Sequence, residues 1–526
     1  MKLTILGTSD LHGQLLGYEP FKDETADNGG MARLCAYVRQ VRAENPNTLL
    51  LDAGDVLQGG ILTDTLCSKS PDEPNPLLTA MNLMGYDAMT LGNHEFDWGI
   101  PNLKKVLSQA EFSVLAANVR DAKGEFLTGN GWKIFRFGEV RVAVIGVVTP
   151  DIPIWNGKTE GVAEYQYLPA ADAVREAIAQ IGTDADLFVV SAHMGLYPEF
   201  DEENDSDSAQ KILDENPGIT VLQVGHNHVV VRQKQGETLI GGVRNNGLDV
   251  ARFDLTLDSQ NRVVDGQVEI VDMSGILPDE EFQKLPFVRD AYERTRQLLS
   301  EREAAGEETG EVIGTATAEF APGDAVQGIP QALFRNNAVM ELIHRVQLKS
   351  SGADVSATPL YRPDAGLPAG ELHEADVETI YPFENLLYCV PVTGAELKAY
   401  MEWSVAAYKT ATSGEATICL PPDVPCFRFD TFAGVEYEID LRQPEGDRIR
   451  NLRFRGEPLQ DEQVLTLAVN NFRYASVLKG EKLVSGKKMW QSSCTIPELL
   501  KDYVRKNTPL TPEVVDNWKV IGTAAL

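Results

Sequence analysis

Side chains that could bind a metal or donate a proton follow five short apolar runs in the first half of the chain. They are Asp10, His12, Asp55, Asn93, His94, His193, His226 and His228. Of the 7 histidines in the sequence, His344 and His373 are the two that lie elsewhere, and we expect both to be structural or surface residues. Functional groups of an α/β sheet gather beyond the ends of its strands. The recurrence of carboxylate, amide and imidazole groups therefore predicts one shared metal site.

Each of these residues has a simpler interpretation when it is taken alone. Asp10 and Asp55 could close turns or cap helices, since Asp side chains often bond to nearby backbone N–H groups. His193, a single histidine after a strand, could be a buried structural residue, and the loop after Leu91 could be an ordinary one. The repetition of the same chemistry in separate loops favours a metal site, with His94 as a proton donor in the same cleft.

The mixture of ligand types suits two divalent ions, with Mn²⁺, Fe, Co²⁺, Ni²⁺ or Zn²⁺ as candidates. No cysteine lies in these loops, which argues against a structural zinc site. One bridging carboxylate can hold two ions about 4 Å apart, and such a pair polarises a phosphoryl group and activates water near neutral pH. The pattern therefore predicts metal-dependent hydrolysis of phosphate compounds.

The size and charge of the chain limit its organisation and partners. A chain of 526 residues is too long for one core, so we expect about two or three domains. A net charge of -31 disfavours binding along a nucleic-acid polymer, which needs a basic face. It does not exclude a nucleotide, because bound dications can reverse the local field. Solubility is the simplest interpretation of the acidity.

The cysteines are scattered and form no Cys-x-x-Cys pair; they are Cys35, Cys67, Cys389, Cys419, Cys426 and Cys494. We expect free thiols, although Cys419 and Cys426 flank a proline-rich loop and could pair in an exported protein. The sequence opens directly on a strand-like segment, and no run is long enough to span a membrane. We therefore expect a cytoplasmic protein with no membrane partner, or a periplasmic or secreted one if a leader has been removed.

Short apolar runs alternate with amphipathic segments over the first half of the chain. Strands are expected at residues 3–6, 48–51, 87–91, 140–148, 187–191 and 221–224. Helical spacing is present at Met31–Arg42, Pro76–Met84 and Ala170–Ile181. This alternation predicts a layered α/β domain with helices on the outside.

A polar stretch, Asp279–Glu311, then predicts a solvated helix that serves as a linker. We expect a first domain at residues 1–275, a helical linker at 276–314 and a second domain at 315–526. In the second domain, helical spacing at Gln331–Leu348 precedes mixed strands and helices, with strand-like runs at Val435–Leu441 and Val464–Val469. This mixture predicts an α+β domain.

The strand-end motifs together resemble those of the calcineurin-like metallophosphoesterases, whose pattern is D-x-H, G-D, G-N-H-(D/E), a single H and G-H-x-H. The resemblance implies a β-sandwich flanked by helices and a centre of two divalent metals. One metal would be held by Asp10, His12 and His228. The other would be held by Asn93, His193 and His226. Asp55 would bridge the two.

The same resemblance implies a catalytic histidine that does not bind metal. His94 would stabilise or protonate the leaving oxygen, and Asp97 would orient His94 through a hydrogen bond.

The second domain resembles the C-terminal domain of the 5'-nucleotidase family. The matching segments are Tyr381–Asn385, Val392–Leu397, Ala433–Tyr437 and Val469–Arg473. In that family two aromatic rings hold the base between them, and by position these would be Phe383 and Phe472, with Asn471 also in the substrate pocket. Stacking of this kind contributes about 1–3 kcal/mol per base. The alternative is that both rings are core aromatics.

The segment Asp354–Arg362 departs from the usual N-G-G-x-R form of 5'-nucleotidases. Its S-A-x-P form resembles the branch that acts as 2',3'-cyclic-nucleotide 2'-phosphodiesterase and 3'-nucleotidase, and the segments Gly434–Asp440, Arg448–Leu452 and Asn470–Arg473 resemble the same branch. The glycine-rich segment often found after the Asn-Asn-aromatic motif is missing near Tyr474–Gly480. We therefore expect a two-metal hydrolase of nucleotide phosphoesters, preferably of this branch.

Three other functions are open from the sequence. A 5'-nucleotidase or UDP-sugar hydrolase would use the same site, and a metal-dependent binding protein would use it without catalysis. A sulfate thiohydrolase would need a cysteine close to the metal ligands, and Cys35 and Cys67 fall outside every ligand motif.

Overall fold

The computed structural model describes residues 1–15, 29–199, 205–305, 312–324, 330–362, 365–383, 385–406, 408 and 428–522. The chain forms two compact units, Met1–Glu301 and Arg302–Leu526. Cys419 and Cys426 lie outside the described residues, whereas Cys35, Cys67, Cys389 and Cys494 are free thiols, as expected. Within the described ranges, no helix is long and apolar enough to cross a membrane.

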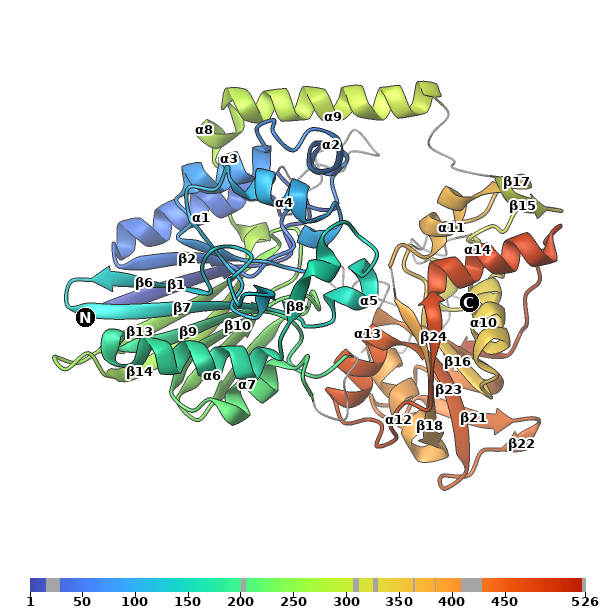
Figure 1. Ribbon diagram of the computed structural model, residues 1–526. Helices are drawn as coiled ribbons and strands as arrows, with labels where there is room; N and C mark the ends of the chain where they lie inside the picture. Colours follow the sequence, from blue (N-terminus) through green and yellow to red (C-terminus); the bar gives the residue numbers. More distant parts are fainter. Residues whose placement is uncertain are drawn as a thin grey trace. The chain divides into compact units, whose positions relative to one another are not determined.

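The first unit contains two six-stranded sheets (Figure 1). In spatial order, the first sheet is β14 (Val263–Asp272), β13 (Asp249–Leu257), β1 (Lys2–Thr8), β2 (Thr48–Asp52), β3 (Ala88–Thr90) and β4 (Ser113–Leu115). The second sheet is β11 (Val231–Gln235), β12 (Thr238–Gly242), β10 (Ile219–Val224), β9 (Leu187–His193), β7 (Val140–Val148) and β6 (Trp132–Phe137). All the predicted strands are confirmed, and β9 continues through His193 itself.

The two sheets pack face to face with helices on both outer sides (Figure 1). Side chains such as Leu3, Ile5, Val142 and Val189 fill the space between the sheets. The first sheet is covered by α1 (Met31–Glu44), α3 (Pro76–Met84) and α4 (Ile100–Leu107), and the second by α6 (Ala170–Ile181) and α7 (Ala209–Glu215). The predicted layered α/β fold, a β-sandwich flanked by helices, is confirmed.

Local sequence explains where these elements begin and end. Pro76 opens α3, Asn75 caps it by accepting the N–H of Leu77 at 3.0 Å, and Gly85 ends it with a left-handed φ of 68°. Strand β7 is buried along nearly all of its length because both faces of its sheet are covered.

Strand direction brings the predicted ligands to one edge of the sandwich. β1, β2 and β3 run parallel to one another, and so do β7, β9 and β10. Loops that follow parallel strands leave the sheet at the same edge. Gln223 in β10 donates to the backbone oxygen of Thr8 at the end of β1 at 2.6 Å, so the strand ends of both sheets share one edge.

The polar stretch after the sandwich is helical. α8 (Glu280–Gln283) and α9 (Pro286–Ala305) follow β14, and Phe282, Val288 and Ala291 are buried in the core of the first unit. The use of residues 276–314 as a linker between domains at 1–275 and 315–526 remains a proposal.

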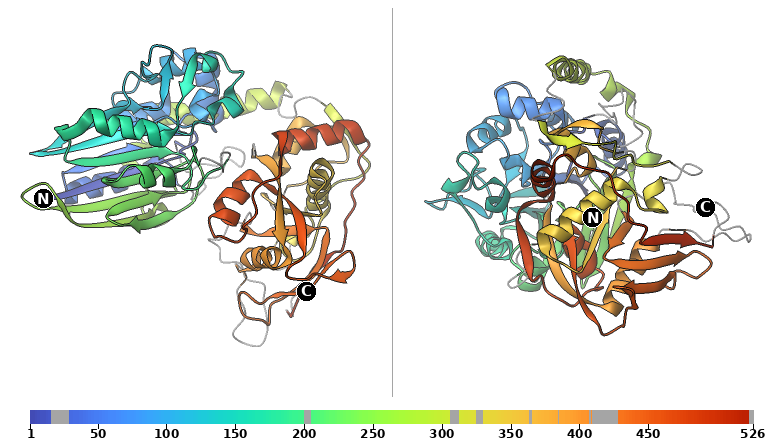
Figure 2. Two further views of the ribbon diagram at one scale, coloured as in Figure 1. Left: turned by 60° about the horizontal axis from the view of Figure 1, so that its bottom comes forward. Right: turned by 90° about the vertical axis from the view of Figure 1, so that its right-hand side faces the viewer.

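The second unit has mixed sheets with helices against them (Figure 2). Its five-stranded sheet is β19 (Asp430–Ala433), β16 (Val355–Pro359), β23 (Val464–Asn470), β18 (Leu386–Thr393) and β24 (Trp490–Thr495). Its four-stranded sheet is β22 (Glu457–Pro458), β21 (Ile449–Phe454), β20 (Val435–Asp440) and β25 (Trp518–Ile521), and β15 (Val312–Ala316) pairs with β17 (Gly370–His373). The helices are α10 (Ala338–Ser351), α11 (Glu374–Ile380), α12 (Gly394–Val405), α13 (Asn471–Arg473) and α14 (Ile496–Asn507). The predicted α+β domain is confirmed.

The start of α10 corrects one prediction. Helical spacing from Gln331 was expected to begin a single helix, but residues Gln331–Leu333 form only a short 3₁₀ turn. Asn337 caps α10 by accepting the N–H of Met340 at 2.8 Å, so the helix begins at Ala338.

His344 and His373 have the structural places expected of them. His344 is buried between the hydroxyls of Ser356 and Thr431, and His373 caps α11.

Candidate metal centre

The structure gathers the predicted ligands into two groups. Asp10, His12 and His228 form one, and Asp55, His193 and His226 form the other. Within each group the ligand atoms all lie within 4.8 Å of one another.

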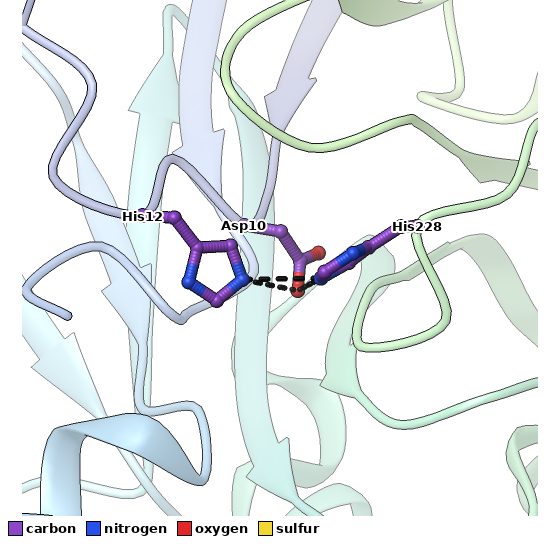
Figure 3. A group of neighbouring side chains, drawn as sticks. All are labelled: Asp10, His12 and His228. Atoms are coloured by element: carbon purple, nitrogen blue, oxygen red, sulfur yellow. Dashed lines mark hydrogen bonds and ion pairs between the residues drawn. The ribbon is translucent and has the colours of Figure 1, made fainter. Parts of the chain in front are cut away.

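The first group converges on one carboxylate oxygen (Figure 3). Oδ1 of Asp10 lies 3.2 Å from Nε2 of His228 and 4.0 Å from Nε2 of His12. The two Nε2 atoms are 3.1 Å apart. Asp10 is fully buried, so its charge is not dispersed by water.

The second group includes Asn93, as predicted. Nε2 of His193 lies 3.0 Å from Oδ2 of Asp55 and 3.0 Å from Oδ1 of Asn93. Nδ1 of His226 lies 2.9 Å from the same Asn93 oxygen. Each distance joins an acceptor oxygen to a ring nitrogen, so a proton or a cation must lie between them.

The backbone at these ligands is unusual. The φ angles of Asp10, His12, Asp55, His226 and His228 are 55°, 47°, 57°, 73° and 52°, all in the left-handed region. Non-glycine residues rarely adopt it, and where they do they cluster at functional sites. All five of these residues belong to the two ligand groups.

The charges of the site favour bound cations. Burial alone would raise the pKa of Asp55, but the neighbouring imidazoles, His193 first, hold it well below its usual value. Burial would lower the pKa of His193, yet Asp55 raises it to about 10. For Asp10, burial is likewise outweighed by His228, and the pKa falls below its ordinary value. The carboxylates therefore draw positive charge to the positions where divalent ions would sit, and the donor set fits such ions.

His94 lies beside the first group but belongs to neither. Its backbone N–H donates to Oδ1 of Asp55 at 2.9 Å, and its ring centroid is 5.6 Å from that of His12. Nδ1 of His94 is 2.9 Å from Oδ2 of Asp97, the contact expected from the sequence. Burial would lower the pKa of His94, but Asp55 and Asp97 raise it to about 9.

Glu95 has a role that the sequence analysis missed. Its buried carboxylate accepts the backbone N–H groups of Asp55 and Gly92 on one oxygen, at 2.9 and 2.6 Å. The other oxygen accepts those of Val56 and Leu57, at 2.9 and 3.1 Å. Burial, then the charge of Asp55, raises the pKa of Glu95 to about 6. Glu95 therefore ties the loop after β2 to the loop after β3.

Gly92 permits the close approach of these two loops. A Cβ at this position would overlap the carboxylate of Asp55, so no other residue fits without moving a ligand.

Three further residues that the sequence did not single out contact the site. Gln58 accepts from Nδ1 of His12 at 2.9 Å, Glu199 accepts from Nε2 of His226 at 2.9 Å, and Asn156 donates to Oδ1 of Asp97 at 2.9 Å. Gln58 lies close to Asp55 in sequence, whereas Glu199 and Asn156 reach the site only through folding.

The predicted substrate residues lie in the second unit. Phe383 is 39% exposed and its ring centroid is 4.9 Å from that of Tyr361, an aromatic that the sequence analysis did not select. Phe472 is half-buried in α13. Asn471 is buried, and its side-chain oxygen accepts the N–H of Leu386 at 2.9 Å, which joins α13 to β18. A substrate role for Phe383, Phe472 and Asn471 remains a prediction.

The cysteines near the first-unit core are separate from both ligand groups. Sγ of Cys35 lies 3.8 Å from a carboxylate oxygen of Asp279, and Sγ of Cys67 lies 3.7 Å from the amide nitrogen of Asn75. Neither Asp279 nor Asn75 is one of the proposed metal ligands.

Known protein families match both halves of the chain. Residues 3–230 match the calcineurin-like phosphoesterases, and residues 312–480 match the 5'-nucleotidase C-terminal domain.

Two relatives match almost the whole chain. The trifunctional nucleotide phosphoesterase protein YfkN of Bacillus subtilis is 24% identical over 575 residues, which cover 98% of this chain but only 39% of that protein. A 2',3'-cyclic-nucleotide 2'-phosphodiesterase/3'-nucleotidase of Yersinia enterocolitica is 24% identical over 584 residues, which cover 98% of this chain and 88% of the relative.

A solved structure shares the fold. A Staphylococcus aureus protein, described as a candidate 5'-nucleotidase in complex with alpha-ketoglutarate, is 24% identical and has a TM-score of 0.58. The match covers 99% of this chain and 100% of that one. The chain therefore contains a calcineurin-like phosphoesterase domain at residues 3–230 and a 5'-nucleotidase C-terminal domain at residues 312–480.

Proposed function

We propose that this chain hydrolyses nucleotide phosphoesters at a centre of two divalent metals, first opening a 2',3'-cyclic phosphate to a 3'-nucleotide and then removing the 3'-phosphate. The observation that carries the proposal is the juxtaposition of two metal-ligand groups with the His94–Asp97 pair. A small nucleotide, rather than a nucleic-acid polymer, suits the net charge of -31.

In this proposal the ligand groups divide between two ions. Asp10, His12 and His228 would hold one, and Asn93, His193 and His226 would hold the other. Asp55 would be shared between them, in keeping with the 3.0 Å between its Oδ2 and Nε2 of His193. Bound divalent ions of this kind polarise the phosphoryl group, activate the attacking water and stabilise charge on the nonbridging oxygens. Mn, Zn, Co, Fe and Ni are the candidate metals.

His94 assists the leaving group in the proposed mechanism. Oδ2 of Asp97 accepts a hydrogen bond from Nδ1–H of His94, which fixes the ring and leaves Nε2 as the nitrogen that can transfer a proton. The departing ribose oxygen would receive that proton in both hydrolytic steps.

The second unit would supply the nucleoside pocket. Phe383 and Phe472 would hold the base between their rings, and Asn471 would help to position α13 beside it. The name of the Yersinia relative favours cyclic and 3'-phosphate substrates, and that of the Bacillus relative favours a nucleotide phosphoester.

A panel of 2',3'-cyclic AMP, 3'-AMP, 5'-AMP and UDP-glucose tests the choice. After reconstitution with Mn²⁺, the proposal predicts fastest turnover of the first two, with 3'-AMP formed before adenosine. Preference for 5'-AMP or UDP-glucose would replace it with a 5'-nucleotidase or UDP-sugar hydrolase. Absence of hydrolysis with every candidate metal would favour a metal-dependent binding protein.

A further inference from the structure

Three ligand histidines have their outer ring nitrogens held by acceptors of different charge. Nδ1 of His12 donates to the amide oxygen of Gln58 at 2.9 Å, and Nδ1 of His193 donates to the backbone oxygen of Ala53 at 2.7 Å. Nε2 of His226 lies 2.9 Å from the carboxylate of Glu199. Of these three acceptors, only Glu199 carries a negative charge.

We propose that Glu199 is a positioning residue for the second metal, because its carboxylate orients the His226 ring and strengthens it as a ligand. This inference rests on the proposed metal centre, but its test requires no turnover.

The contact with Glu199 decides which nitrogen of His226 faces the metal. A carboxylate can only accept a hydrogen bond, so Nε2 carries the proton and Nδ1 presents its lone pair. Nδ1 is the atom that lies 2.9 Å from Asn93, on the side of the second group. Without Glu199, Nε2 of His226 would lose the carboxylate that favours its protonated form, and the proton could occupy Nδ1 instead.

The backbone of His226 is also held by a carboxylate. Its N–H donates to both oxygens of Asp10, at 3.2 and 3.1 Å, and its φ of 73° is left-handed. Asp10 therefore positions the backbone of His226, and Glu199 orients its ring. The ring of Trp155, 5.8 Å from the His226 ring, packs beside it.

Contacts within the first unit hold Glu199 in place. Its backbone N–H donates to Oδ2 of Asp207 at 2.9 Å, and Asp207 is 3% exposed. The start of α7 is joined to the loop after β9, since Ala209 donates its N–H to the backbone oxygen of Gly195 at 3.0 Å. The side chain of Glu199 is only 14% exposed. Its carboxylate is therefore preorganised.

The size of the effect follows from the general behaviour of such partners. Removal of the group that holds the outer nitrogen of a metal-bound histidine typically costs about 10–100-fold in metal affinity. Glu199→Gln keeps an acceptor oxygen but loses the charge, whereas Glu199→Ala loses both. We expect second-site affinity to fall slightly in the first variant and by about 10–100-fold in the second.

The test is calorimetric titration of the metal-free full chain with Mn²⁺, with anomalous scattering to assign each ion to its group. Glu199→Gln and Glu199→Ala should weaken only the ion at Asn93, His193 and His226. Gln58→Ala is the matched variant for the other group and should weaken only the ion at Asp10, His12 and His228. Glu237→Gln removes a carboxylate whose side chain is 97% exposed and should change neither ion.

The outcomes separate this inference from the proposed function. If the unchanged protein binds two ions and both Glu199 variants do so with the same affinities, the positioning role is wrong while the metal centre stands. If both ions weaken equally, Glu199 acts on the fold and not on His226, and the inference is again wrong. Should Glu199→Ala fail to fold, Glu199→Gln decides. If the unchanged protein binds no second ion, the proposed function itself fails.

Discussion

Asn156 donates its side-chain N–H to Oδ1 of Asp97 at 2.9 Å, while Oδ2 of the same carboxylate lies 2.9 Å from His94. Asn156 ends the short helix α5 (Ile152–Asn156) and is buried. Both oxygens of Asp97 are thus engaged, and the carboxylate cannot rotate away from His94. Asn156, Asp97 and His94 therefore form one hydrogen-bonded chain.

Asn156→Ala should lower kcat by about tenfold, because it removes one hydrogen bond to a charged group, worth about 1.5 kcal/mol. Metal content should not change. Steady-state kinetics in the unchanged and Asp97→Ala backgrounds form the cycle that tests this. The effect should nearly vanish once Asp97 is absent. Equal effects in both backgrounds would show that Asn156 acts elsewhere.

His94→Ala should cut turnover by about 10²–10⁴, the range of lost acid–base assistance, without displacing metal. Turnover and metal content are measured on the same reconstituted sample. His373→Ala, which changes a histidine in the second unit, is the control and should keep full turnover. Loss of an ion in His94→Ala would mean that His94 is a ligand.

Glu95→Gln should destabilise the metal-free protein. One carboxylate oxygen becomes an NH₂ group, which faces two backbone N–H donors and leaves them without an acceptor. Each such buried donor costs about 1–3 kcal/mol. Thermal unfolding should show a lower Tm than in His94→Ala. An unchanged Tm would contradict the role of Glu95 in joining the loops after β2 and β3.

The first unit was largely predictable because its signals are local. The apolar run at 140–148 and the helical spacing at Ala170–Ile181 match β7 and α6. The motifs place each ligand just beyond a strand, and parallel strands bring those ends together. Helix starts depend on single capping residues, which is why the start of α10 at Ala338 was misplaced.

The contacts around the ligands were not predictable in the same way. In the sequence, α7 and β10 lie between Glu199 and His226, and no periodic pattern predicts that their side chains meet. The left-handed φ of Asp10 and His228 is imposed by the packing of several loops on one another. Glu95 stands between two predicted site residues, yet only the fold shows that its carboxylate faces the backbone.

The second unit should lose stability in mild acid through His344. Burial lowers the pKa of His344 to about 3 from 6.5, so the unfolded chain takes up a proton below 6.5 that the folded chain does not. The contribution of His344 to the free energy of unfolding is therefore fully present above pH 6.5. Below it, this free energy falls by about 1.4 kcal/mol for each pH unit, down to about pH 3.

His344→Gln removes this titration while keeping polar atoms for Ser356 and Thr431. Urea unfolding of the metal-free chain at about pH 7 and about pH 5.5 should show a smaller loss in the variant, by roughly 1.4 kcal/mol. An equal loss in both proteins would show that His344 does not contribute.

Two ions in the first unit are the basis of the proposed chemistry. Metal-free protein is reconstituted with Mn²⁺, and the ions are counted by elemental analysis and located by anomalous scattering. We expect two ions, one at Asp10, His12 and His228 and one at Asn93, His193 and His226, with Asp55 between them. An empty site, or ions bound away from these side chains, would contradict it.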